Sequence, residues 1–96
     1  MGYHFEWSTL KAAENEAKHG VSFDEATEVF GDPLALNMRD PDHSRREERL
    51  LVLGLSRRQR LLVVSYALRD TRTRIIGSRR ASRSERQRYE EDPSSR

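Results

Sequence analysis

Hydrophobic residues recur along the first third of the chain at helical spacing. Ser8 is the expected N-cap of a first helix, and Gly20 is its expected end. A second helix follows at once, because Ser22–Glu25 has the sequence of a capping box, and Gly31–Pro33 ends it. The predicted apolar stripe of the first helix consists of Leu10, Ala13 and Ala17.

Strand patterns follow the two helices. Short turns at Ser56–Gln59 and around Asp70 join the later strands as consecutive hairpins, which favours an antiparallel meander over a β-α-β unit. A strand-like segment at Phe5–Trp7 precedes the first helix. The predicted strands are Leu34–Arg39, Arg49–Leu55, Arg60–Leu68 and Thr73–Arg79.

One more predicted helix follows the strands. Ser82–Glu85 is a second capping box, and the helix continues to Glu91 with Tyr89 as its single large apolar side chain. We therefore expect one α+β domain over residues 1–91, in which two N-terminal helices pack on a twisted antiparallel sheet of about four strands, with a C-terminal helix. Residues 92–96 are expected to form a disordered tail.

Composition narrows the class of protein. The 96 residues include no cysteine, which excludes disulfide bonds and thiolate zinc sites. The longest purely apolar run, Leu61–Val64, is far short of the roughly 20 residues that a membrane span needs. The first residues have neither the basic start nor the apolar core of a signal peptide. We expect a cytoplasmic protein that has no contact with a membrane.

Charge divides the chain into two halves. Up to Asp42, three basic residues face nine acidic ones, whereas 15 basic and seven acidic residues follow from His43 onward. Only two of the 18 basic residues are lysines, and arginine is the residue better suited to bidentate contact with phosphate. The basic half indicates a polyanionic partner such as nucleic acid, although solvated arginines on the protein surface give the same pattern.

Candidate chemistry is limited to arginines, histidines and acids. The sequence has no Gly-rich phosphate loop and no motif of the common hydrolases. His43 with Asp40 and Asp42 comes nearest to a metal cluster, but a polar loop explains that grouping more simply, so we expect no metal and no cofactor. Metal-free RNA cleavage needs only a base for the ribose 2′-OH, positive charge at the phosphate and an acid for the leaving oxygen. Arginines at strand ends, which cluster at the rims of a sheet, supply that charge: Arg60, Arg69, Arg74 and Arg79.

Short motifs in a fixed order cover residues 5–90, and together they resemble the BrnT toxin family. The first of them are Phe5-Glu6-Trp7, Lys11-Ala12, Asn15, Lys18-His19-Gly20-Val21-Ser22-Phe23, Glu25-Ala26, Val29-Phe30 and Asp32-Pro33. The later ones are His43-Ser44, Glu47-Glu48-Arg49, Gly54-Leu55-Ser56, Arg60–Val64, Arg74-Ile75-Ile76, Arg79-Arg80-Ala81, Glu85-Arg86 and Tyr89-Glu90.

The resemblance implies a ribonuclease toxin of a type II toxin–antitoxin system, which arrests translation until its antitoxin binds. It implies a RelE-like fold, a BrnA-like antitoxin with a ribbon-helix-helix DNA-binding part, a heterotetrameric complex and repression of operator DNA through the antitoxin. RNA is then the expected substrate.

The expected catalytic residues of such a toxin are of two kinds. Arg60, Arg69 and Arg79 are expected to bind phosphate and neutralise transition-state charge, while Lys18 and His19 transfer or position protons. Further candidates for phosphate binding are Arg57, Arg58, Arg74 and Arg80. Second choices for the base, or for contact with the antitoxin, are His43, Glu47 and Glu48.

One departure from the family pattern concerns Gly77. Family members usually have Ile-Ile-Ser-Ala-Arg where this chain has Ile75–Arg79, and a glycine inside a strand marks an expected β-bulge that re-aims Arg79.

Two other functions stay open. One is a non-catalytic nucleic-acid-binding module, such as a degenerate toxin in promoter autoregulation; the other is a RelE-fold toxin that inhibits a protein target such as DNA gyrase.

Overall fold

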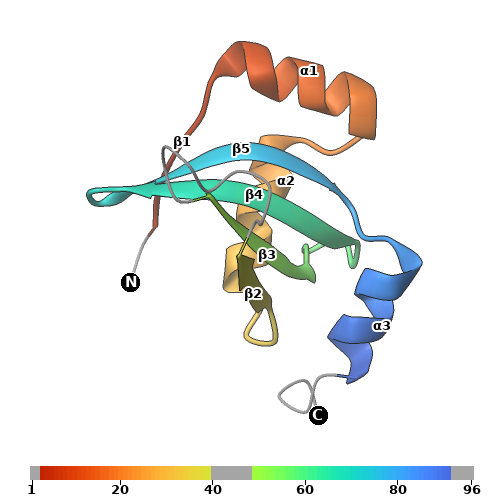
Figure 1. Cartoon of the computed structure of the whole chain (residues 1–96). Helices are drawn as coiled ribbons and strands as arrows, with labels where there is room; N and C mark the ends of the chain where they lie inside the picture. The colour runs from red at the N-terminus through yellow and green to blue at the C-terminus, as the bar shows by residue number, and fades with distance from the viewer. Residues whose placement is uncertain (1–2, 40–48, 92–96) are drawn as a thin grey trace.

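The computed structural model describes residues 3–39 and 49–91, which form three α-helices and five β-strands (Figure 1). None of these helices is long and apolar enough to cross a membrane. In chain order the elements are β1 (His4–Glu6), α1 (Thr9–His19), α2 (Phe23–Glu28), the 3₁₀ turn η1 (Val29–Gly31), β2 (Leu36–Arg39), β3 (Arg49–Leu55), β4 (Leu61–Arg69), β5 (Arg72–Arg80) and α3 (Arg83–Glu91). The expected disordered tail, residues 92–96, lies outside the described residues.

The five strands form one mixed sheet in the order β1-β5-β4-β3-β2. The pairs β2–β3, β3–β4 and β4–β5 are antiparallel, as the hairpin pattern predicts. β1 instead pairs in parallel with β5, with Phe5 opposite Thr73. The prediction of an antiparallel sheet of about four strands is corrected in this respect, because a three-residue segment separated from the sheet by two helices carries no pattern that identifies its partner.

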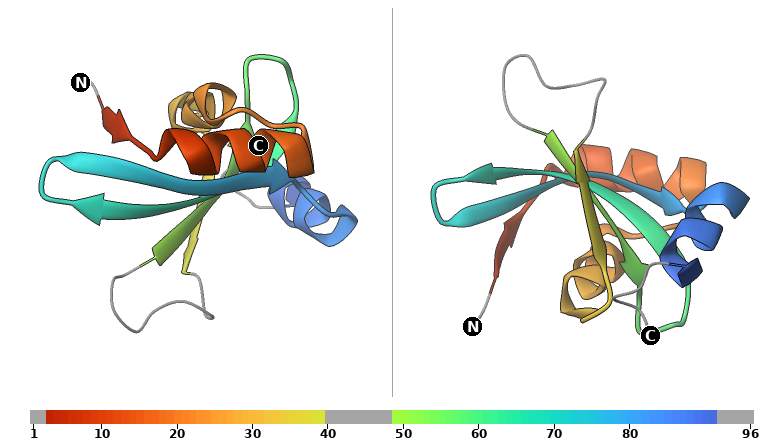
Figure 2. Two further views of the ribbon diagram at one scale, coloured as in Figure 1. Left: turned by 90° about the horizontal axis from the view of Figure 1, so that it is seen from above. Right: turned by 60° about the horizontal axis from the view of Figure 1, so that its bottom comes forward.

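The sheet buries apolar side chains on both faces, because successive residues of a strand point to opposite sides. On the face that α2 covers, Phe23 shares one apolar cluster with Leu62 and Val64. On the other face, Tyr89 of α3 shares a second cluster with Val63. We call these the α2 face and the α3 face; α2 lies behind the sheet in Figure 1, and α3 lies beyond one end of it (Figure 2).

α1 runs alongside β5 and is held there by a polar residue rather than by its apolar stripe (Figure 2). Leu10 is 68% exposed, and the two alanines of the predicted stripe, Ala13 and Ala17, are exposed as well. The Asn15 amide instead donates to the carbonyl oxygens of Val21 and Ser78 and accepts from the Ser78 N–H, at 2.9–3.1 Å. The helical period therefore predicts α1 correctly, but the wrong face of it as buried.

A β-bulge interrupts β5 where Gly77 predicts it. Ser65 pairs with Gly77 and Tyr66 with Ile75, so Ile76 is the extra residue. One added residue shifts the alternation of every later side chain. Arg79 therefore lies on the α3 face, opposite Val63, rather than on the α2 face.

Candidate functional site

The strand-end arginines do not converge on one groove. Arg60 directly precedes β4 and Arg79 lies near the end of β5, so these two are at the same end of the sheet. Arg69 closes β4 beside the turn to β5. β4 has nine residues, which at about 3.3 Å per residue puts Arg69 roughly 30 Å from Arg60. The structure does not bring the three expected catalytic arginines together.

Arg74 also lies toward the turn end of the hairpin, away from Arg60. Glu6 of β1 accepts hydrogen bonds there from Arg72 at 3.2 Å and Arg74 at 3.4 Å. The hydrogen bond from Arg72 is the main cause that holds the pKa of Glu6 below its ordinary value. This cluster joins β1 to β5 and accounts for Arg74 without any ligand.

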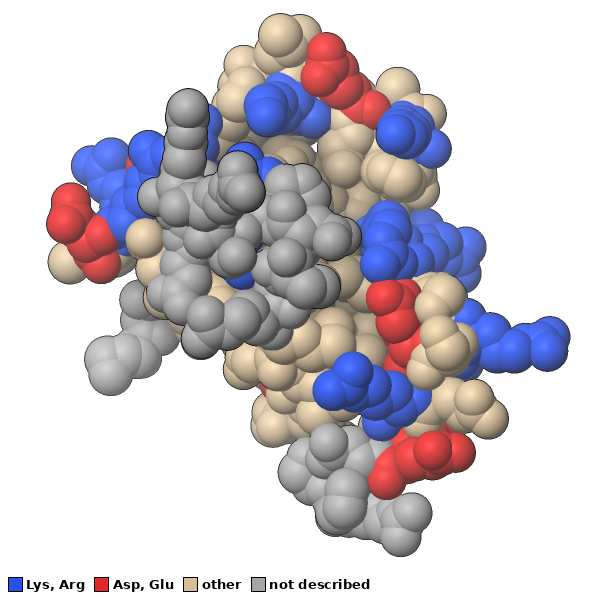
Figure 3. All heavy atoms as spheres, in the orientation of Figure 1, with Lys and Arg blue, Asp and Glu red and all other residues tan. Residues whose placement is uncertain are grey.

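The other expected catalytic and phosphate-binding residues that the structure describes gather where β4 begins and β5 ends. The Leu61 carbonyl oxygen accepts from Ala81 N at 2.9 Å, and Arg60 donates to the carbonyl oxygen of Gly20, the residue after α1, at 3.0 Å. We call this region the basic end; it consists of Lys18, His19, Arg57, Arg58, Arg60, Arg79 and Arg80. In Figure 3, Lys and Arg side chains follow one another down the right-hand edge from α1 to α3, with acidic side chains between them.

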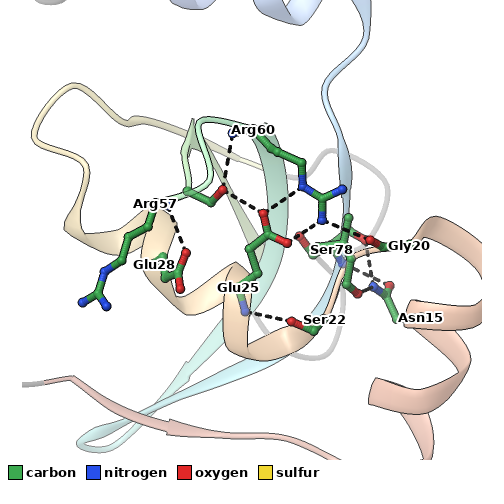
Figure 4. Close-up of polar contacts among 10 residues, drawn as sticks. Asn15, Gly20, Ser22, Glu25, Glu28, Arg57, Arg60 and Ser78 are labelled. Carbon is green, nitrogen blue, oxygen red and sulfur yellow. Dashed lines mark hydrogen bonds and ion pairs between the residues drawn. The ribbon is translucent and has the colours of Figure 1, made fainter.

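Arg60 forms the first of two arginine–glutamate pairs at the basic end (Figure 4). Its Nε donates to Oε2 of Glu25 at 2.9 Å, and its Nη2 donates both to Oε1 of Glu25 and to Gly20. Glu25 is only 5% exposed and also accepts a hydrogen bond from Ser56 Oγ at 2.8 Å. The hydrogen bonds from Arg60 lower the pKa of this carboxyl, so Glu25 is ionised and Arg60 neutralises it.

Glu25 thereby links three elements of the basic end. It lies in the first turn of α2, Ser56 follows β3, and Arg60 connects both to the end of α1. Gly20 turns the chain between α1 and α2 with φ +70°, a conformation that glycine adopts without steric cost. Arg60 therefore uses its Nε and Nη2 groups to connect α2 and the β3–β4 turn to the end of α1.

Lys18 and His19 form the last turn of α1, directly before Gly20. Both side chains line a shallow hollow of about 260 Å³ between α1 and the bulge of β5, together with Asn15 and Ile76. The hollow borders the β5 edge that β1 leaves uncovered, since β1 pairs only as far as Arg74. The structure thus brings Lys18 and His19 together at one hollow beside this edge.

The turn between β3 and β4 carries two exposed arginines. The backbone N–H of Arg57 donates to Glu28 of α2 at 3.0 Å, and the following turn is closed by Gln59 at φ +64° (Figure 4). The side chain of Arg57 is exposed, as is that of Arg58. The turn is fixed by its backbone while its charges extend into solvent.

Arg79 forms the second arginine–glutamate pair, on the α3 face. Its Nη1 and Nη2 each donate to one oxygen of Glu85 at 2.9 Å. Glu85 is also the capping residue of α3, because it accepts from Ser82 N at 2.8 Å while its own N–H donates to Ser82 Oγ at 3.2 Å. The bond from Arg79 is the main cause that lowers the pKa of Glu85 to about 2. Arg80, the next residue of β5, is exposed and lies on the opposite, α2 face, paired with Leu62.

α3 is anchored by more than the apolar contact of its tyrosine. Tyr89 is 8% exposed and donates to Oδ2 of Asp32 at 2.6 Å. Asp32 also accepts from the backbone N–H groups of Leu34 and Leu55, both at 2.9 Å. Burial and this hydrogen bond raise the pKa of Tyr89 to about 12. The helix that carries Glu85 is thus tied to the core.

Sequence reasoning missed the acids and the amide that organise this region. The sequence analysis gives Glu25 and Glu85 as members of capping boxes and of family motifs, and Asn15 as part of a motif, but none of the three as a site residue. The spacing Ser-x-x-Glu marked both glutamates, but nothing in it indicates an arginine partner from a distant strand. The second-choice residues His43, Glu47 and Glu48 lie outside the described residues. Among residues 3–39 and 49–91, no three His, Asp or Glu side chains come close enough together to hold a metal ion.

Comparison with known proteins gives two matches. The family model described as the ribonuclease toxin BrnT of type II toxin–antitoxin systems matches residues 7–85, which is most of the chain. The crystal structure of the Brucella abortus ribonuclease toxin BrnT is similar, with a TM-score of 0.63 and 24% sequence identity over 85% of this chain and 100% of that chain. No curated protein sequence matches. At this identity the structural likeness concerns the fold.

Proposed function

This chain belongs to the BrnT family of ribonuclease toxins of type II toxin–antitoxin systems, and we propose that it is an endoribonuclease that needs no metal ion. The observation that carries the proposal is the family match over residues 7–85. The gathering of cationic side chains at the basic end supports a site there, because RNA cleavage places negative charge on the phosphate in the transition state.

In the proposed reaction the ribose 2′-oxygen attacks the adjacent phosphorus. A bond forms between the 2′-oxygen and phosphorus, the bond to the 5′-oxygen breaks, and a 2′,3′-cyclic phosphate remains. Lys18 and His19 take the proton from the 2′-OH and return one to the 5′-oxygen; histidine is the residue used most often for such transfers. Arg79 neutralises the phosphate, and Arg57, Arg58 and Arg80 bind neighbouring phosphates.

Two arginines of the expected catalytic set take other roles in this proposal. Arg60 positions the end of α1 through Gly20, since Glu25 occupies its Nε–Nη2 edge. Arg69 and the phosphate candidate Arg74 lie toward the turn end of β4 and β5, too far away to contact the same phosphodiester.

We expect the toxin to act in the cytoplasm, arresting translation, until a BrnA-like ribbon-helix-helix antitoxin binds it in a heterotetramer that also occupies operator DNA. The type II family supports an antitoxin partner. A partner that binds only the folded toxin stabilises it by about 4 kcal/mol at a thousandfold excess over Kd. At about 4–8 °C per kcal/mol, the Tm should rise by more than about 10 °C when antitoxin is added.

An RNA cleavage assay in EDTA tests the proposed function. Purified toxin, separated from antitoxin, should cleave RNA in the presence of EDTA and leave 2′-O-methyl RNA and DNA intact, because neither carries the nucleophilic 2′-OH. Activity that disappears in EDTA and returns with magnesium would contradict the metal-free mechanism. Absence of any cleavage, with growth arrest retained, would favour a protein target such as gyrase. Loss of both with DNA binding retained would favour a regulatory module.

A further inference from the structure

The guanidinium of Arg79 has one edge in use and one edge open. Of its five N–H groups, Nη1 and Nη2 each donate one to Glu85, and the second hydrogen of Nη1 lies toward the Arg80 carbonyl oxygen at 3.3 Å. Within the described part of the chain, Nε and the second hydrogen of Nη2 have no acceptor. These two form the side-on edge, a parallel pair of donors that matches two oxygens of one phosphate.

The open edge belongs to a side chain that is partly exposed to solvent. The side chain of Arg79 is 44% exposed, whereas that of its partner Glu85 is 23% exposed. Arg60 shows the opposite arrangement, since Glu25 occupies its side-on edge and Gly20 takes the other hydrogen of Nη2. Arg60 therefore has no complete donor edge left, and Arg79 does.

Glu85 is held in place independently of Arg79. Its carboxylate accepts from the backbone N–H of Ser82 at 2.8 Å, a bond that does not depend on the serine side chain. Tyr89 ties the same helix to Asp32. The carboxylate is thus a rigid support for a long, flexible arginine side chain.

We propose that Glu85 is a positioning residue, which grips the end-on edge of Arg79 so that the side-on edge is presented to a phosphodiester of RNA. This inference rests on the proposed function and deepens it. An arginine that is already oriented loses less conformational freedom when it binds, and a misplacement of about 1 Å can cost about 100-fold in rate. The carboxylate of Glu85, which caps α3, thus affects the reaction by orienting Arg79.

Glu85→Gln tests the proposal, with Ser82→Ala as the matched control. Glutamine keeps the size of the side chain, but it has one acceptor oxygen and cannot hold both Nη groups of Arg79. Ser82→Ala removes the other half of the capping box and leaves the carboxylate on Arg79. We expect Glu85→Gln to lower kcat on a short RNA by roughly tenfold to 100-fold, with a smaller change in KM. Ser82→Ala should keep the wild-type kcat despite a loss of helix stability.

A nuclear magnetic resonance titration reports the role directly. The Nε–Hε signal of Arg79, assigned by its disappearance in Arg79→Lys, should shift on addition of inorganic phosphate or a 2′-O-methyl dinucleotide. The shift should occur in the wild type and in Ser82→Ala, and it should be absent or much weaker in Glu85→Gln. Equal loss of kcat in Glu85→Gln and Ser82→Ala, or an unchanged titration in Glu85→Gln, would overturn the proposal. Because the phosphate titration needs no cleavage, it tests Glu85 even if the wild type cleaves no RNA and the proposed function fails.

Discussion

The start of α2 and the start of α3 carry the same sequence motif and use it differently. In each, a serine Oγ accepts the N–H of a glutamate three residues later, at 3.0 Å for Glu25 and 3.2 Å for Glu85. At α3 the carboxylate also returns to the serine N–H and holds Arg79. At α2 the carboxylate turns inward to Arg60 and Ser56 instead.

Exposure separates the roles of the two ion pairs. The side chains of Arg60 and Glu25 are 24% and 5% exposed, and those of Arg79 and Glu85 are 44% and 23% exposed. Removing one member of a buried ion pair leaves the other charge buried without a partner, which lowers the stability of the fold. An exposed pair contributes little to stability. The Arg60–Glu25 pair therefore serves to stabilise the fold, whereas the Arg79–Glu85 pair leaves one donor edge of the arginine open to a ligand.

Removing Arg60 should have the largest effect on stability. Arg60→Ala leaves the carboxylate of Glu25 buried and unpaired, and breaking such a pair costs about 3 kcal/mol where water can partly reach it. Urea denaturation should show this loss, while Arg79→Ala should lose less than about 1 kcal/mol. Similar losses of unfolding free energy for the two variants would contradict the distinction between a stabilising pair and a ligand-binding pair.

Removing Arg79 should have the largest effect on activity. Arg79→Ala is expected to reduce RNA cleavage roughly 100-fold to 1,000-fold, the cost of losing one group that stabilises transition-state charge. Arg79→Lys should lose most of the activity too, since a point charge lacks the bidentate edge. Arg72→Ala, which removes an exposed arginine at the other end of β5, is the control and should cleave RNA at the wild-type rate. Full activity of both Arg79 variants would exclude Arg79 from the site.

Asn15 tests whether a polar contact is enough to hold α1 at the basic end. Asn15→Ala removes three hydrogen bonds to Val21 and Ser78 and leaves their backbone groups part-buried without a partner, which should cost about 1–3 kcal/mol. Hydrogen exchange should increase in α1 before it increases in β4. Unchanged protection of α1 would show that other contacts dock this helix.

Acid should reduce the small contribution that the Arg79–Glu85 pair makes to the stability of the fold. Glu85→Gln, which has no carboxyl at this position, should lack this part of the pH dependence. The pKa of Glu85 is lowered from 4.5 to about 2, chiefly by the hydrogen bond from Arg79. Because the folded state holds the carboxyl at the lower pKa, the pair stabilises the fold fully above about pH 4.5 and loses this contribution as the pH falls toward 2. The Tm difference between wild type and Glu85→Gln should shrink over this interval. A constant difference would contradict the pairing.

Much of the local structure followed from the sequence alone. Ser8 and Ser22 cap helices as predicted, β3 has the predicted bounds, and the bulge lies beside Gly77. Each of these depends on a few neighbouring residues, because capping, hairpin turns and bulges are decided by local hydrogen bonds and backbone preferences. The order of motifs, which spans most of the chain, was also enough to indicate the BrnT family.

The tertiary structure decided which of these residues meet. The parallel pairing of β1, the exposed stripe of α1 and the different partners of Glu25 and Glu85 all depend on segments far apart in the chain. The sequence does not distinguish Arg60, whose side-on edge is occupied by the buried carboxylate of Glu25, from Arg79, whose side-on edge is left open by the partly exposed Glu85. The physical reason is that ion pairing and burial are set by the packing of helices on the sheet, whereas the sequence pattern specifies only where the helices and strands begin and end.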